Sequence, residues 1–258
     1  MHEEKKQSTV LEKAIIILEY LTNFPNGAAL SEIASGVGMN KSTVYRILQT
    51  YKKYNYILQS SSSGYYRLGG RLLLFSPFIS EFDMVASIYP YMKEYSDLTG
   101  FSTNLAVLKD FSSITVETYV PHTTSSIRIE PEKGYISKLY CCATGKVFLA
   151  NMKQETLKRY LAEIKLLPMT EHTITDSDIL LNDLNLVRER GYSIEMMENE
   201  SHIISLASPI YNSQQEIQAA LGIMLLSHTA EERNIQQIGE NLSKETWKIS
   251  QSLGANII

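Results

Sequence analysis

Three short helical patterns and one hairpin pattern share the first seventy residues, and no other feature of the sequence constrains the fold as strongly. The turn sequence NFPNG separates the first two helical stretches, and Gly36 and Gly38 separate the second from the third. Asn40 precedes the third stretch and is a favourable N-cap residue. In each stretch apolar side chains recur at the period of an amphipathic helix; the stretches are residues 10–23, 30–37 and 41–53.

A β-hairpin is expected directly after the third helix. The strand-forming runs YIL at 56–58 and YYRL at 65–68 flank a polar, serine-rich segment that ends at Gly64. Three helices followed by a hairpin have the order of a winged helix-turn-helix domain. We therefore expect residues 1–70 to form such a domain.

Charge is distributed unevenly between this domain and the rest of the chain. Residues 1–70 hold eight Lys and Arg against five Asp and Glu, a net charge of +3, so the remaining residues hold 16 against 23, a net charge of −7. An N-terminal piece that is basic relative to an acidic remainder is typical of a module that faces a polyanion.

The outward face of the third predicted helix carries side chains suited to DNA. In a helix-turn-helix this helix enters the major groove, where its N-terminal turn contacts phosphates and later residues contact base edges. Arg46 can bind guanine and Gln49 can bind adenine through paired hydrogen bonds. Arg67 and the serine-rich tip belong to the wing and would touch the DNA backbone or minor groove. A charged helix face is often only solvated, but the surrounding helices and hairpin favour DNA binding here. The candidate residues on this helix are Lys41, Ser42, Thr43, Tyr45, Arg46 and Gln49.

The rest of the chain predicts a helical linker and an α+β domain. Residues 71–98 are apolar and aromatic, interrupted by Pro77 and Pro90, and we interpret them as linker helices with an apolar surplus that favours self-association. Residues 99–258 would form the second domain. Thr175 is expected to cap a helix that Gly191 ends. Strands are expected at 104–108, 114–120, 126–129, 192–196, 203–210 and 219–226, and helices at 143–152, 154–163, 176–190 and from Thr229, with Glu232 in a capping box, to about Gly254.

Several other classes of protein are disfavoured. The chain is 44% hydrophobic and 20% charged, which is typical of a folded globular protein, and its polar N-terminus shows neither a signal peptide nor a membrane span, so we expect a cytoplasmic protein. Cys141 and Cys142 are adjacent and are expected to be reduced thiols. The five histidines lack metal-ligand spacing, so no metal or other cofactor is expected. Lys146 follows a glycine but lacks the rest of a phosphate-binding loop, and no nucleophile elbow occurs, so we expect no enzyme.

At this point the sequence resembles the IclR-type bacterial transcriptional regulators. The likeness covers nearly the whole chain, and its specificity comes from the order and spacing of its motifs. These include LSEIA at 30–34, KSTVYRIL at 41–48, YRLG at 66–69, ATGKVFLA at 143–150, VRERGY at 187–192 and LASPI at 206–210. The resemblance implies a winged-helix domain that also uses Ser31, a dimerising linker helix and a GAF-like effector domain. It also implies a homodimer or homotetramer on a palindromic operator in double-stranded DNA.

The resemblance further implies a pocket for a small metabolite beside the first turn of the Ala143 helix, whose open amides can bind an anion. Gly222 and Met224 stand where some members have hydroxyl residues, so a less polar pocket is expected. Ser205 stands where many members have Cys, and Lys138 and His202 are further departures, in place of a common Pro and a common Gly. Each position also has a structural alternative: Met224 can be core, Glu195 a surface charge at a strand end, and Ser205 a partner within its sheet. The family's ligand-contacting positions fall on Ala143, Thr144, Glu195, Ser205, Gly222 and Met224.

Two functions remain at this stage. The preferred one is a DNA-binding transcriptional regulator, most often a repressor in this family, whose operator binding responds to a small organic-acid-type effector, without a membrane partner. The alternative is a metabolite-binding or catalytic domain whose N-terminal helices serve only for assembly. Salt-sensitive binding to promoter DNA would distinguish them.

Overall fold

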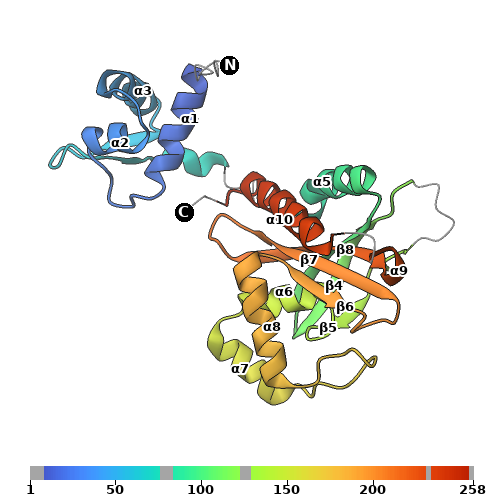
Figure 1. Ribbon diagram of the computed structural model, residues 1–258. Coiled ribbons are helices and arrows are strands. Elements are labelled where there is room, and N and C mark those ends of the chain that lie inside the picture. Colours follow the sequence, from blue (N-terminus) through green and yellow to red (C-terminus); the bar gives the residue numbers. More distant parts are fainter. Residues whose placement is uncertain (1–8, 76–83, 123–128, 231–233, 256–258) are drawn as a thin grey trace. The chain divides into compact units, whose positions relative to one another are not determined.

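The protein forms two compact units, Met1–Phe82 and Asp83–Ile258 (Figure 1). The computed structural model describes residues 9–75, 84–122, 129–230 and 234–255. The first unit contains, in order, α1 (Val10–Leu21), α2 (Leu30–Gly36), α3 (Lys41–Lys53), β1 (Ile57–Gln59), β2 (Tyr66–Leu68) and the 3-10 helix η1 (Gly70–Phe75). The predicted three helices and hairpin are confirmed, with α1 ending two residues earlier than expected.

Local chemistry explains why α3 begins and lies where it does. The side chain of Asn40 accepts a hydrogen bond from the backbone N–H of Thr43 at 2.8 Å, which satisfies one of the unpaired amides of the first turn. Val44, Ile47 and Leu48 face inward and are buried in the core of this unit. The opposite face of α3 is thereby left to solvent.

The second unit is built around one antiparallel sheet of six strands in the order β5-β4-β3-β8-β7-β6. The strands are β3 (Ser102–Lys109), β4 (Ser112–Tyr119), β5 (Ile136–Lys138), β6 (Ser193–Met196), β7 (Ile203–Tyr211) and β8 (Ile217–Leu226). The helices are α5 (Met84–Thr99), α6 (Ala143–Asn151), α7 (Gln154–Glu163), α8 (Ser177–Arg190), α9 (Ser227–Ala230) and α10 (Ile235–Ser252). The predicted α+β class, with an N-terminal winged helix-turn-helix and a C-terminal domain of sheet and helices, is confirmed.

The two faces of this sheet differ in the size of their side chains. Large residues such as Leu221 and Ile223 of β8 pack with Met92 of α5 and Leu242 of α10 in one core cluster. Small residues face α6 instead, among them Ala106, Ala207 and Ala220. Small side chains let α6 lie close to the strands, and Figure 1 shows α6 and α8 on the side of the sheet opposite α5 and α10.

Two predicted helix starts are wrong. Asp176, and not Thr175, caps α8, because its carboxylate accepts hydrogen bonds from the N–H groups of Asp178 and Ile179 at 2.8 and 3.0 Å. The final helix predicted from Thr229 is two helices, α9 and α10, and Asn234 caps the second by accepting from the N–H of Gln237. Glu232, which the expected capping box required, lies outside the described residues.

The strand and linker predictions need smaller corrections. Residues 126–128 of the strand expected at 126–129 lie outside the described residues, Ile129 is not in a strand, and β5 was not predicted. Pro90, expected to interrupt the linker, lies inside α5. That helix packs within the second unit through Ile88 and Met92, and the three-part division of the chain at residues 70 and 98 stays a prediction.

In the parts of the chain that are described, no helix combines the length and hydrophobicity that crossing a membrane requires.

Adjacent glycines after the hairpin offer a test of the packing in the first unit. A Cβ atom at Gly69 would lie 2.3 Å from the carbonyl oxygen of Asn55, whereas one at Gly70 meets nothing within 4 Å. We expect Gly69→Ala to destabilise the unit by about 1–3 kcal/mol, because backbone cannot move aside as a side chain can. Gly70→Ala is the matched control and should be nearly neutral. Thermal unfolding followed by circular dichroism measures both, and equal melting temperatures would contradict the packing described.

Candidate nucleic-acid interface and ligand cavity

The outward face of α3 presents a row of polar and basic side chains. Lys41, Ser42, Tyr45 and Arg46 are exposed, while Thr43 and Gln49 are half-buried. No acidic residue lies in the first turn of α3, and its last turn holds Lys52 and Lys53. The predicted DNA-facing residues of α3 therefore lie at helical spacing opposite the buried face.

Two of these side chains have close neighbours inside the unit. The hydroxyl of Ser42 donates to the cap residue Asn40 at 2.9 Å. Gln49 lies near the hydroxyl of Tyr66 and acts to lower its pKa, but burial dominates and raises that pKa. Gln49 is half-buried and Arg46 is exposed, so Arg46 is the freer of the two predicted base-reading side chains.

The hairpin is attached to α3 by a side-chain contact. The ammonium of Lys52 donates to Gln59 of β1 at 2.8 Å, and the Gln59 amide donates to the carbonyl of Gly64 at 3.2 Å. Arg67 on β2 and Ser31 in the first turn of α2 are exposed, as DNA contacts require. The predicted interface residues thus lie in one small unit that is held together by α3.

The second unit contains a cavity of about 210 Å³ beside the N-terminus of α6. All six residues expected to contact an effector line it: Ala143, Thr144, Glu195, Ser205, Gly222 and Met224. Strand register explains why residues so distant in sequence meet. Glu195 is paired with Ser205 across β6 and β7, and Ser205 with Met224 across β7 and β8. These three side chains therefore lie in one row on the face of the sheet that α6 covers only in part.

Asn104 on β3 also lines the cavity and was not predicted from the sequence. Its backbone is paired with Gly222, and a Cβ atom at Gly222 would lie 2.3 Å from the Asn104 amide oxygen and 3.2 Å from a Thr144 methyl group. The Asn104 side chain therefore fills the space that a side chain at position 222 would take. Other polar lining residues that were missed are Thr115, Ser137, Cys142 and Asn199. These groups make part of the lining polar, and the lower polarity relative to similar proteins stays a prediction.

Glu195 is a buried cavity carboxyl group, so the alternative of a strand-end surface charge is wrong. Its side chain is 2% exposed. One carboxyl oxygen accepts hydrogen bonds from the backbone N–H groups of Glu198 and Asn199, and these bonds favour the ionised form. Burial outweighs these hydrogen bonds and raises the pKa of Glu195 to about 7.

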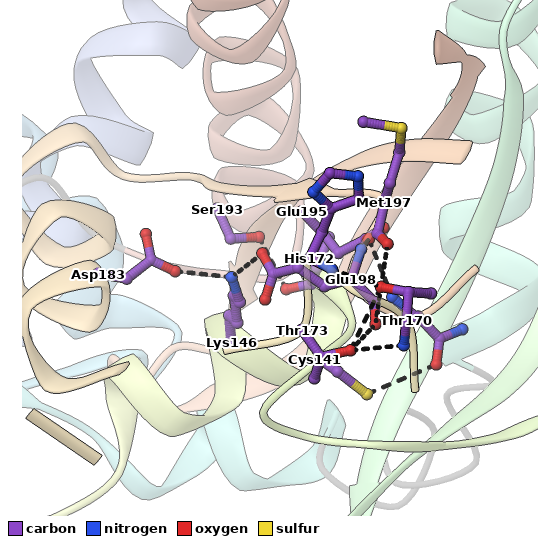
Figure 2. Close-up of polar contacts among 12 residues, drawn as sticks. Cys141, Lys146, Thr170, His172, Thr173, Asp183, Ser193, Glu195, Met197 and Glu198 are labelled. Atoms are coloured by element: carbon purple, nitrogen blue, oxygen red, sulfur yellow. Dashed lines mark hydrogen bonds and ion pairs between the residues drawn. The ribbon is translucent and has the colours of Figure 1, made fainter. Parts of the chain in front are cut away.

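A buried ion-pair cluster adjoins the turn that follows Glu195, and Figure 2 shows Lys146 between Asp183 and Glu198. Lys146 of α6 is 1% exposed, and its ammonium contacts Glu198 at 2.5 Å and Asp183 of α8 at 2.8 Å. Burial alone would lower the pKa of Lys146, but the two carboxylates raise it, so this group stays charged. Thr170 and Thr173 donate to the carbonyls of Met197 and Glu198, both at 2.6 Å, and hold the turn after β6. The turn that positions Glu195 is therefore fixed from both sides.

The two cysteines of this region are free and buried. Cys142 caps α6 by accepting the N–H of Gly145 at its sulfur, at 3.3 Å. Burial raises the pKa of Cys141 to about 12 and also raises the pKa of Cys142, so both stay protonated thiols. Within the described ranges, no group of three or more His, Cys, Asp or Glu residues could hold a metal ion.

Comparison with known proteins assigns both units to one family. The "IclR helix-turn-helix domain" profile matches residues 10–59, and the "Bacterial transcriptional regulator IclR C-terminal" profile matches residues 77–251. This chain is a member of the IclR family of transcriptional regulators. It is 27% identical to the DNA-binding transcriptional repressor YiaJ of Escherichia coli over 98% of this chain and 90% of that protein. It is 31% identical to the regulator KdgR of Escherichia coli over 87% of this chain and 85% of that protein.

Solved structures support the same fold. A crystal structure of a regulator from a Silicibacter species, titled as an IclR-type protein, superimposes with a TM-score of 0.85 and covers 97% of this chain and 98% of that one, at 21% identity. As a member of the IclR family, the protein combines a DNA-binding helix-turn-helix unit with an effector-binding unit. Its relatives are named as regulators and repressors of transcription.

The raised pKa of Glu195 predicts a pH-dependent difference between the wild type and Glu195→Gln. Between the ordinary pKa of 4.5 and about 7, the folded protein keeps a proton that the unfolded chain has released, so this group lowers stability as pH rises. The glutamine variant lacks this term. The unfolding free energy of the variant minus that of the wild type should therefore increase by about 3 kcal/mol between pH 4.5 and 7. At higher pH this difference should stay constant. Urea unfolding at a series of pH values measures the difference, and a pH-independent difference would contradict the assignment.

Proposed function

We propose that this IclR-family protein is a transcriptional repressor whose binding to a palindromic operator is controlled by a small metabolite with an acidic group. The observation that carries the proposal is the presence, in one chain, of an exposed basic α3 face and a polar cavity at the first turn of α6. DNA binding is assigned to the first unit and effector binding to the second.

For DNA recognition, Arg46 is assigned to base readout. Its side chain is exposed in the middle of α3, while the neighbouring Gln49 is half-buried. A guanidinium binds the two acceptors of guanine in the major groove. Lys41, Ser42 and Thr43 lie in the first helical turn, where the positive end of the helix dipole favours phosphate. We assign these three residues to contacts with the phosphates of the DNA backbone. Tyr45, Ser31 and Arg67 are assigned to the edge of the interface.

Ligand control of binding to a palindromic operator requires two copies of the protein and two arrangements of those copies. A repressor on a palindrome places one α3 in each half-site, so a homodimer or a homotetramer fits the proposal. An effector that binds one arrangement of the copies better than another shifts the population between them. Repression is supported by the relatives named as repressors, YiaJ of Escherichia coli and AllR of Salmonella typhi.

Two substitutions in α3 separate base readout from phosphate contact. Arg46→Ala should weaken binding to operator DNA by roughly 10- to 100-fold, and binding to unrelated DNA much less, because a base contact is lost. Lys41→Ala should weaken binding to both DNAs about equally and reduce the salt slope by about 1, because one phosphate contact is lost. Fluorescence anisotropy with intergenic DNA from beside the protein's own gene, at several salt concentrations, measures both effects.

Arg159→Ala on α7 is the control, since it removes the same charge from an exposed site of the other unit. It should bind DNA like the wild type. Equal affinity of Arg46→Ala and the wild type for the operator would refute the assigned readout. Weak, sequence-independent binding by the wild type itself would favour the alternative in which the N-terminal helices serve only for assembly.

A further inference from the structure

The cavity has an anion-binding end at α6. The first-turn amides of Gly145 and Lys146 are used by Cys142, at its sulfur and at its carbonyl oxygen. In the described structure the amides of Ala143 and Thr144 have no acceptor, and both residues line the cavity. Two free amides at the positive end of a helix dipole attract a carboxylate. Ala143 and Thr144 are almost completely buried, so an anion bound there would be shielded from water.

The opposite end of the cavity is acidic. Ser193 of β6 donates to the carbonyl of Ala143 at 2.7 Å, which fixes α6 above that point of the strand. Glu195 follows two residues later, and two residues of a strand span about 7 Å. The side chain of Glu195 thus belongs to the row beyond the end of α6, together with Ser205 and Met224. One of its carboxyl oxygens receives the two backbone amides, and the residue lines the cavity.

Further carboxylates surround the cavity mouth. Glu130, Glu132 and Glu200 line the cavity and are exposed to solvent. Among the described lining residues there are four glutamates and no Lys, Arg or His. A simple mono- or dicarboxylate would gain from the α6 amides but would be repelled by these glutamates. A simple amine would be attracted by the glutamates but would leave the α6 amides unsatisfied.

We propose that the effector is a small zwitterion of the amino-acid type, with its carboxylate on the amides of Ala143 and Thr144 and its ammonium group facing Glu195. The inference rests on the proposed function of the cavity as the effector site, and it narrows the acidic metabolite to one that also carries a positive charge. Asn104 and Thr115 line the cavity as well and supply neutral hydrogen-bonding groups. The carboxylates at the mouth favour such a ligand over a simple anion.

Calorimetry with the full-length protein tests this, using the twenty common amino acids, β-alanine and γ-aminobutyrate as probes. For each probe that binds, the N-acetyl derivative removes the positive charge and the carboxamide removes the negative charge. We expect at least one amino acid to bind and both of its derivatives to bind at least about tenfold more weakly. Butyrate, succinate, pyruvate and n-butylamine are the simple ions for comparison. Tighter binding of any of these four, or no binding by any amino acid, would overturn the proposal.

Substitution locates the ammonium group. Glu195→Gln should reduce affinity for the amino acid about tenfold or more but leave affinity for its N-acetyl derivative unchanged. Only the amino acid carries the ammonium group that interacts with the Glu195 carboxylate. Glu216→Gln, in the exposed turn between β7 and β8, is the matched control and should bind like the wild type. Equal losses for the amino acid and the N-acetyl derivative would show that Glu195 acts only on the shape of the cavity and would overturn its assignment.

Repeating the DNA-binding measurement with each probe distinguishes this inference from the proposed function. Release of the operator by a simple acid but by no amino acid would refute the zwitterion and leave a ligand-controlled repressor. If neither class of probe binds the protein or changes its affinity for DNA, both the zwitterion and the effector role of the cavity are wrong. Release by an amino acid and not by its derivatives would support both.

Discussion

The buried ammonium of Lys146 holds together the parts of the second unit on which the cavity depends. It is almost fully removed from water, and it contacts a carboxylate on α8 and one in the turn between β6 and β7. Desolvating such a charge costs several kcal/mol, so the ion is tolerated only where both partners stay in place. Glu198 is one partner, and its backbone N–H is also one of the two amides that Glu195 accepts. A single network therefore connects α6, α8 and the acidic end of the cavity.

The cavity exists because the sheet is packed unequally on its two faces. Alanines and a glycine let α6 lie close to the strands, but α6 covers only part of that face and begins at Ala143. Beyond its first turn the strands carry Glu195, Ser205 and Met224, which line the cavity. The same close approach that buries α6 therefore leaves its unpaired amides beside an open row of side chains. At Gly222 the space of the missing Cβ atom is filled by the Asn104 side chain of the neighbouring strand β3.

Local sequence patterns predicted most of the helices and strands but not the composition of the cavity. The caps at Asn40 and Gly191 and the apolar periods of α1 to α3 depend on neighbours a few residues away, so they are visible in the sequence. Thr175 and Asp176 can both cap a helix, and the choice between them depends on backbone geometry that the sequence does not show. The six cavity positions came from the family resemblance. Asn104 was missed because its importance depends on the pairing of β3 with β8, which joins strands distant in the chain.

The burial of Glu195 shows most clearly where sequence reasoning reaches its limit. A glutamate near the end of a short strand is usually solvated, and the sequence gives no reason to bury this one. The turn that follows contains Met197 with a φ of +59°, and it brings two backbone amides onto the carboxyl group. Those amides make burial tolerable, while the low polarizability of the surroundings keeps proton binding favourable near neutral pH. A carboxyl group with a pKa of about 7 can take up or release a proton near neutral pH when a charged ligand binds beside it. The chemistry of this cavity is therefore determined by a turn of the backbone as much as by the residues that line it.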